Sequence, residues 1–299
     1  MEGYHSPVLL REVMDGLGIR SGKWYLDCTL GDGGHSLEIL RLGGKVVGID
    51  VDPEALERAE KRLQAAGYRQ QEDFILVQGN FRDIKNLLKQ KTDIQRSGFA
   101  GAIFDLGVSS LQLESPERGF SFVKEGPLDM RMDPALEVCA LDLINVGGRK
   151  ELDELFDGLG EEKYSRAVAD ALVLARKVGL STRDLAGLVE KVYRKHGIRK
   201  RKIHPATKVF QALRIAVNDE LNALETGLEE VNDLIENYGH IVLISFNSLE
   251  DRIVKNTFKA WEAVGLGRVL TKKPIRPGLE EVSDNPRSRS AKMRVFEIL

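Results

Sequence analysis

A glycine-rich turn beside strand-ending aspartates is the part of this 299-residue sequence best suited to chemistry. Residues 27–35 read DCTLGDGGH and lie between a predicted strand and a predicted helix. Glycines let the backbone turn sharply and approach a ligand closely, and a helix N-terminus offers unpaired N–H groups. Asp50 ends the next predicted strand, nineteen residues after Gly31, a spacing that suits a carboxylate bonded to both hydroxyls of a ribose. The pattern favours nucleotide-type binding at a turn that includes Asp27 and Gly31, and a purely structural turn is the alternative.

Two further strand ends narrow the choice of ligand. Phe81 follows the third predicted strand, where its ring is able to stack on an adenine, and Asp105 ends the fourth, facing the reacting centre. Carboxylates at three strand ends suit a cationic ligand better than a pyrophosphate. S-adenosylmethionine carries a sulfonium and an ammonium group, whereas NAD would place two phosphate charges over the turn. The third glycine of the dinucleotide fingerprint is also replaced, by Ser36. We therefore prefer S-adenosylmethionine to NAD as the cofactor.

Several other kinds of site find no support in the sequence. The five histidines lack HExxH or paired spacing and the two cysteines form no CxxC motif, so no metal site is expected. There is neither a P-loop nor a GxSxG elbow. No apolar run approaches the roughly 18 residues of a membrane helix, and the charged first twenty residues do not resemble a signal peptide. A cytoplasmic protein without a metal or a membrane partner is predicted.

The net charge of −2 conceals a strongly basic segment. Residues 191–218 contain nine lysines and arginines and no acidic residue, and residues 285–295 add four more basic side chains. A basic segment on an acidic body favours a localised site for a polyanion, because attraction to phosphates does not depend on sequence. The alternative is a solvated helix end and loop.

The elements that position these residues follow an α/β pattern. Strands are predicted at 23–28, 45–50, 74–77 and 100–104, alternating with helices, and Ser6 and Pro7 are expected to begin a first helix. Residues 115–211 show only helical patterns, at 141–145, 152–159, 162–178 and 182–196, the last capped by Ser181 with Asp184. A helix over 211–237 and strands at 240–245 and 294–298 then resume the α/β pattern. We predict a doubly wound parallel sheet in residues 1–114 and 212–299, interrupted by an all-helical insertion domain at 115–211.

The motifs together closely resemble the MraW/RsmH family, bacterial methyltransferases that modify the exocyclic amine of a cytidine in small-subunit ribosomal RNA. The resemblance is carried by residues 5–10, 27–36, 48–53, 105–112, 118–122, 126–133, 204–214, 244–252 and 285–291. It implies a class I, Rossmann-like methyltransferase sheet with an inserted helical domain. Its pattern for binding S-adenosylmethionine falls on Gly33, Gly34, His35, Asp50, Phe81, Asp105 and Gln112.

The resemblance also implies an RNA substrate in the assembled or nearly assembled small subunit. The basic residues expected to bind it are Arg118, Arg199, Lys200, Arg201, Lys202, Lys208, Arg287 and Arg289. The sequence departs from the family at two positions, with Asn247 in place of a usual histidine and Lys208 in place of an arginine. Asn247 cannot act as a general base, and Lys208 lacks the bidentate fork that an arginine offers a phosphate.

The expected reaction is in-line displacement, in which the amine of the cytidine attacks the sulfonium methyl group. Asp105 or a neighbouring backbone carbonyl is predicted to accept a hydrogen bond from the amine and to receive its proton late, with Asn247 and Ser109 as orienting groups. Two other readings stay open: a nicotinamide-dependent oxidoreductase on the same kind of sheet, and an RNA-binding protein without activity that retains the nucleotide fold. The first leaves the basic segment unexplained, and the second predicts no affinity for a cofactor.

Overall fold

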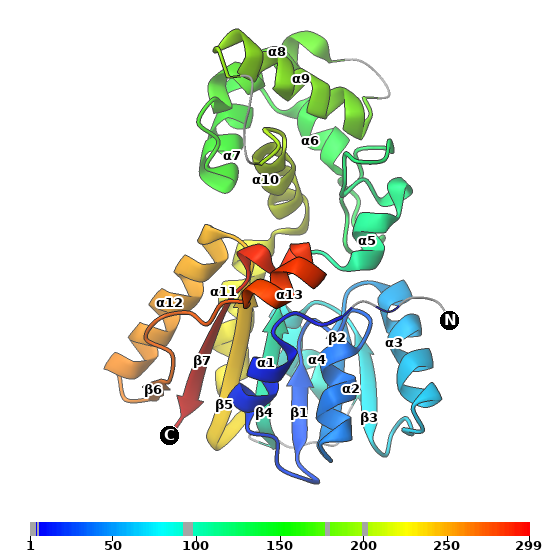
Figure 1. Cartoon of the computed structure of the whole chain (residues 1–299), viewed down its shortest axis with the longest axis vertical. Helices are drawn as coiled ribbons and strands as arrows, with labels where there is room; N and C mark the ends of the chain where they lie inside the picture. The colour runs from blue at the N-terminus through cyan, green and yellow to red at the C-terminus, as the bar shows by residue number, and fades with distance from the viewer. Residues whose placement is uncertain (1–3, 5, 92–97, 177–179, 199–202) are drawn as a thin grey trace. The chain divides into compact units, whose positions relative to one another are not determined.

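Two compact units make up the chain (Figure 1). The computed structural model describes residues 4, 6–91, 98–176, 180–198 and 203–299. The first unit, Met1–Gly107 with Leu221–Leu299, contains the β-sheet and is called the sheet unit below. The second, Val108–Glu220, is called the helical unit.

The sheet unit contains seven strands in the order β3-β2-β1-β4-β5-β7-β6. Five of them run parallel, from β3 to β5, and β7 is antiparallel to both of its neighbours. The strands are β1 (Trp24–Asp27), β2 (Lys45–Asp50), β3 (Phe74–Gln78), β4 (Phe99–Asp105), β5 (Ile235–Ser245), β6 (Gly267–Val269) and β7 (Lys292–Ile298). The predicted α/β class is confirmed, and its parallel sheet carries an antiparallel C-terminal strand. The strand order reverses between β1 and β4, and ligands of such sheets bind beyond the carboxyl ends of the strands at that point.

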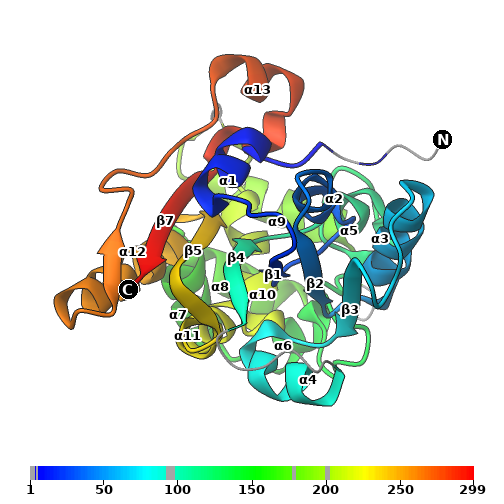
Figure 2. The same cartoon turned by 90° about the horizontal axis from the view of Figure 1, so that it is seen from below.

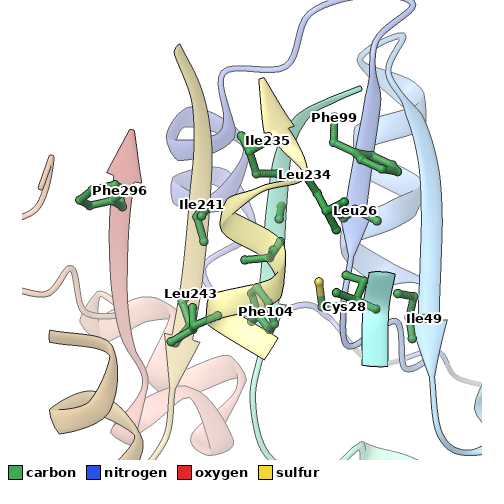
Figure 3. Close-up of a cluster of buried hydrophobic side chains, with 14 of the residues drawn as sticks. Leu26, Cys28, Ile49, Phe99, Phe104, Leu234, Ile235, Ile241, Leu243 and Phe296 are labelled. Carbon is green, nitrogen blue, oxygen red and sulfur yellow. The ribbon is translucent and has the colours of Figure 1, made fainter. Parts of the chain in front are cut away.

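Helices cover both faces of the sheet (Figure 2). On one face lie α1 (Leu10–Leu17), α2 (Gly34–Arg41) and α3 (Pro53–Ala65). The other face carries α4 (Ile84–Lys91), α11 (Glu220–Asn232) and α12 (Ser248–Ala263). Side chains alternate between the faces along each strand. In β4, for example, Phe104 packs under α11 and α12 while Ile103 packs under the α1–α3 layer. Figure 3 shows Phe104 with Leu26, Cys28 and Leu243 in the first of these cores.

The helical unit has a core of its own. Its elements are α5 (Ser110–Glu114), η2 (Pro116–Arg118), α6 (Ala140–Val146), α7 (Arg149–Gly160), α8 (Ser165–Ala175), α9 (Thr182–Lys195) and α10 (Thr207–Asn218). Phe156, Val189 and Leu213, from three different helices, are fully buried in one cluster. The predicted cap of α9 is present, since the Ser181 hydroxyl accepts from the Asp184 amide and the Asp184 carboxylate accepts from the Ser181 amide.

The prediction of one long helix over residues 211–237 was wrong. The chain forms α10 and α11 instead, with Asp219 between them in the left-handed conformation at φ 50°, and β5 already begins at Ile235. Phe210 and Leu213 of α10 are buried in the core of the helical unit. That unit therefore spans Val108–Glu220, beginning before and ending after the boundaries of 115–211 drawn from the sequence.

The first helix also begins later than predicted. Helix α1 starts at Leu10, after Leu9 in the left-handed conformation at φ 53°, and Ser6 forms no cap. The backbone N–H of Leu9 donates instead to Glu281 Oε1 of α13 (Leu279–Asp284), at 2.8 Å. This long-range bond fixes the start of α1, and Pro7 is left outside the helix.

Among the described residues, no helix is both long enough and apolar enough to cross a membrane.

Candidate active site

The ends of β1 and β4 meet at the point where the strand order reverses, and Asp27 ends β1 there. Its carboxylate is buried, with Oδ2 accepting from the Ser36 hydroxyl at 2.6 Å and Oδ1 from the Thr29 amide at 3.3 Å. Burial raises the pKa of the Asp27 carboxyl, and the bond from Ser36 opposes that rise. Asp27 therefore ties the turn after β1 to the first residues of α2.

The glycines of this turn are required for different reasons. Gly31 has φ 51°, and a Cβ added there would meet nothing within 4 Å, so a ligand has room to approach. Gly33, at φ 71°, packs against Ala59 of α3, where a Cβ would lie 3.2 Å from the alanine methyl group. A Cβ on Gly34 would overlap the ring of Pro7. Gly31 is the glycine best placed to meet a cofactor, whereas Gly33 and Gly34 also serve packing.

Replacing Gly34 with alanine tests this packing role. Because the Pro7 ring is rigid and stands where the new methyl group must go, we expect the free energy of unfolding to fall by roughly 1–3 kcal/mol. Urea denaturation measures the change. Gly278→Ala is the matched control in the same unit, since a Cβ there meets nothing within 4 Å and should change stability by no more than about 0.5 kcal/mol. Equal stability of the two variants would contradict the proposed overlap.

Asp50 ends β2 with its carboxylate held by backbone amides. Oδ2 accepts from the Gly31 N–H at 2.8 Å and Oδ1 from the Asp52 N–H at 2.9 Å. Burial raises the pKa of Asp50 to about 6, although these two bonds oppose the rise. The carboxylate is thus fixed beside the open Gly31, as the predicted ribose contact requires.

The raised pKa of Asp50 predicts pH-dependent cofactor binding. Ribose hydroxyls donate to the ionised carboxylate, and protonation below about pH 6 removes an acceptor and a negative charge. The Kd for S-adenosylmethionine should therefore be constant above pH 6 and rise by about tenfold per pH unit well below it. Calorimetric titration from neutral to acidic pH measures this rise. Asp50→Asn should bind weakly with no such slope, and a slope that persists in this variant would contradict the assignment.

Asp105 and His35 face each other across the same strand ends. His35 Nε2 lies 3.5 Å from Asp105 Oδ2, and the Asp105 amide donates to Thr29 Oγ1 at 2.6 Å. Within the described part of the chain, both ring nitrogens of His35 and Oδ1 of Asp105 are buried without a hydrogen-bond partner. Buried polar atoms are normally satisfied, so these atoms fit a ligand that completes their bonding. With the open space at Gly31, they make the site compatible with a cationic nucleoside cofactor.

Phe81 begins η1 (Phe81–Asp83), directly after β3. Its ring meets Phe104 edge-on, with centroids 5.4 Å apart, and lies against Gly227 of α11, where an added Cβ would come within 2.6 Å of the ring. Phe81 is half-buried. Part of this ring is therefore used in the core, and its stacking on an adenine stays a prediction.

The predicted orienting groups, Asn247 and Ser109, both cap helices. Asn247 Oδ1 accepts from the amides of Leu249 and Glu250, each at 3.0 Å, and its Nδ2 donates to the Glu250 carboxylate. In the helical unit, Ser109 and Gln112 form the corresponding capping box of α5, with bonds of 3.2 and 3.1 Å. The patterns N-x-x-E and S-x-x-Q signal such caps, and our sequence interpretation overlooked both. Any contact of these three residues with cofactor or substrate stays a prediction.

The predicted RNA-binding residues divide into three groups. Arg118 donates to the carbonyls of Arg131 and Met132, and Lys208 donates to the Glu161 carbonyl, so both contribute to the internal structure of the helical unit. Arg287 and Arg289 are exposed on η3 (Pro286–Ser290) of the sheet unit. The remaining residues, Arg199, Lys200, Arg201 and Lys202, lie outside the described residues.

A second basic segment near η3 was not predicted from the sequence. Lys272, Lys273 and Arg276 are exposed, and the neighbouring Ile275 exchanges two backbone bonds with Met293. Met293 pairs with Ile244, one residue before the end of β5. The segment therefore lies at the carboxyl edge of the sheet, as Asp50 and Asp105 do. In the described ranges, no group of three histidine, cysteine or acidic residues is arranged to hold a metal ion.

The chain is similar over nearly its whole length to known methyltransferases. The model of the MraW methylase family matches residues 2–299. A relative named ribosomal RNA small subunit methyltransferase H, from Persephonella marina, is 45% identical over 97% of this chain and 98% of its own length. A protein of that name from Carboxydothermus hydrogenoformans is 43% identical over 100% of this chain and 99% of its own. Among solved structures, an rRNA methylase from Streptococcus thermophilus aligns over 99% of both chains at 12% identity, with a TM-score of only 0.45. The two sequence relatives and the family model cover essentially the whole chain, and the chain therefore belongs to the MraW methylase family.

Proposed function

We propose that this protein transfers a methyl group from S-adenosylmethionine to the exocyclic N4 amine of a cytidine in 16S ribosomal RNA. The observation that carries this function is a carboxylate oxygen of Asp105, at the switch point of the sheet, that has no hydrogen-bond partner among the described residues. It occurs in a chain that matches proteins named ribosomal RNA small subunit methyltransferase H over nearly its full length. Those names also favour S-adenosylmethionine over NAD.

The cofactor would be held at the carboxyl ends of the parallel strands. When bound, S-adenosylmethionine supplies an electrophilic methyl group on a positively charged sulfur. Asp50, fixed by two backbone amides, accepts hydrogen bonds from the ribose, and Gly31 leaves room for close approach. The carboxylates of Asp27 and Asp105 give this edge the negative charge that suits a cationic ligand. In the sheet unit, contacts from Gly33, Gly34 and Phe81 and from the backbone at His35 complete the proposed site.

Asp105 activates the amine of the cytidine. The lone pair of that amine is delocalised into the ring, which makes the nitrogen a poor nucleophile. A carboxylate oxygen that accepts one amine N–H orients the nitrogen and increases its electron density, and it receives the proton as the new bond forms. Asn247 lies two residues beyond the end of β5, the strand that pairs with β4. Its Nδ2 carries two hydrogens, and the one that does not bond to Glu250 would donate to the base and orient it.

The basic residues bind the RNA backbone. Arg287 and Arg289 expose two positive charges at the carboxyl edge, and Lys272, Lys273 and Arg276 add three. Residues 199–202 contribute four more in the sequence. The target base must be unstacked to reach the methyl group, so a single-stranded cytidine presented by the assembled or nearly assembled small subunit is the expected substrate. Such an enzyme works in the cytoplasm, where ribosomes are assembled.

A transfer assay with three RNA preparations tests this substrate. Methyl-labelled S-adenosylmethionine is incubated with the protein and either small subunits lacking the modification, naked 16S RNA or large subunits. Label is expected in 16S RNA from small subunits, with less in naked 16S RNA and none in large subunits. Equal labelling of large and small subunits would contradict the proposed substrate.

A further inference from the structure

His35 is a buried histidine that lacks the usual bonding of a structural one. Its side chain is about 7% exposed, and neither ring nitrogen has a hydrogen-bond partner among the described residues. A buried polar group without a partner is destabilising, so a purely structural reason for this imidazole is lacking. Hydrophobic packing alone would be served by an apolar side chain.

The other described histidines show the contrast. His240 Nδ1 contacts the Gly16 carbonyl at 2.6 Å and its Nε2 contacts Glu297 at 3.4 Å. His204 contacts Glu190 through Nε2 and accepts from the Ala206 amide, and His196 contacts the Val192 carbonyl. Each of these three has a hydrogen-bond partner for at least one ring nitrogen, whereas among the described residues His35 has only the 3.5 Å approach to Asp105.

The surroundings of His35 place it against the proposed reacting carboxylate. Its Nε2 lies 3.5 Å from Oδ2 of Asp105, whose side chain is 25% exposed although its Oδ1 is buried. Thr29, on the same turn as His35, holds the backbone of Asp105 at 2.6 Å. Among the described residues, two acidic groups interact with the ring: Asp27 of β1 through its charge, and Asp105 of β4 at 3.5 Å. Both are acidic and favour an N–H directed at a carboxylate.

We propose that His35 is a positioning residue for methyl transfer, acting through Asp105. Its Nε2–H already faces Oδ2 of Asp105 in the free protein and donates to it at closer range once the site is filled, since catalytic hydrogen bonds are often long in the free protein. With Oδ2 held in this way, the carboxylate cannot rotate, and Oδ1 stays directed at the amine. This inference rests on the proposed function, because it assigns the amine proton to Asp105.

The step balances in atoms and charge. A bond forms between the amine nitrogen and the methyl carbon, and the carbon–sulfur bond breaks with its electron pair left on sulfur. The nitrogen loses one proton to Oδ1 of Asp105. The proton passes from Asp105 to solvent after the methylated product dissociates, and His35 keeps its own Nε2 proton throughout.

Three variants test the proposal. His35→Ala removes the donor, and His35→Gln retains an N–H donor near the position of Nε2. His240→Gln is the matched control, because His240 also pairs with a carboxylate but lies at Gly101 of β4, away from the carboxyl edge. For each variant, kcat and KM are measured with small subunits, and the Kd for S-adenosylmethionine is measured separately by calorimetry.

His35→Ala should lower kcat by roughly 10- to 100-fold, with a much smaller change in the Kd for the cofactor. His35→Gln should recover most of the lost kcat, and His240→Gln should match the wild-type enzyme. A fall in cofactor affinity that accounts for the whole loss, or no recovery with glutamine, would overturn the proposal. If wild-type protein labels no RNA, the proposed function fails, and the spectroscopic test below still examines His35.

A spectroscopic measurement needs no activity. In the free protein, 15N spectra of labelled histidine report which ring nitrogen carries the hydrogen, at a pH where imidazole is neutral. We expect the Nε2–H form of His35, and loss of this preference in Asp105→Ala. A wild-type His35 in the Nδ1–H form would contradict the proposed donor.

Discussion

Replacing Asp105 with asparagine is expected to lower kcat for methyl transfer by roughly 10²- to 10⁴-fold without unfolding the protein. Asparagine keeps the size of the side chain but cannot accept the amine proton. Oδ1 of Asp105 has no hydrogen-bond partner in the described part of the chain, and Oδ2 only faces His35 at 3.5 Å. The substitution therefore removes little that stabilises the fold. Initial rates with saturating S-adenosylmethionine and small subunits measure the effect.

Asp233→Asn is the control for the loss of one carboxylate. Asp233 is exposed and forms an ion pair with Lys85. It precedes the start of β5 and therefore lies away from the carboxyl edge of the sheet. This variant should retain wild-type kcat, and circular dichroism should show both variants folded. Near-normal turnover in Asp105→Asn would exclude Asp105 as the proton acceptor, whatever the substrate.

The second large effect is expected on RNA binding. Replacing Arg199, Lys200 and Lys202 with glutamate should weaken binding to small subunits by roughly 10- to 100-fold near physiological salt. Each basic side chain that contacts a phosphate releases a counterion, and the substitutions remove these contacts. The slope of log K against log salt should become shallower by about 2, at roughly 0.7 per contact for single strands. The Kd for S-adenosylmethionine should not change. Filter binding over a range of salt concentrations measures both quantities.

A triple reversal elsewhere separates a local contact from net charge. Lys89, Lys255 and Lys259 are exposed on α4 and α12, helices that lead from the carboxyl edge back to the opposite edge of the sheet. Their reversal changes the net charge equally and should leave the salt slope at its wild-type value. If both triple variants weaken RNA binding equally, residues 199–202 act only through the net charge of the protein and make no local contact with RNA.

Most of the sheet could be predicted because its signals are local. Buried strands read as short apolar runs, and the strand 45–50 was placed at its observed bounds. The Ser181 cap of α9 was visible because capping uses fixed residue types at fixed spacing. The break between α10 and α11 was not visible, since Asp219 adopts its left-handed conformation without a glycine to mark it. The start of α1 depends on Glu281, far away in the sequence.

The grouping of the three aspartates of the site was predictable because parallel strands end at the same edge of a sheet. This rule brought Asp27, Asp50 and Asp105 together from their places in the sequence alone. What single residues do there depends on neighbours that the sequence does not reveal. Gly34 faces Pro7, and the side chains of Ser109 and Asn247 cap helices. The pairing of His35 with Asp105 arises only from the packing of β1 beside β4.

The most direct test of the account identifies the methylated nucleoside. Small ribosomal subunits from cells lacking this activity are incubated with the protein and methyl-labelled S-adenosylmethionine, and their RNA is digested to nucleosides and separated. The account predicts label in N4-methylcytidine, absent when Asp105→Asn replaces the wild-type protein. Label in another nucleoside, or no label despite measurable binding of S-adenosylmethionine, would contradict the proposed reaction.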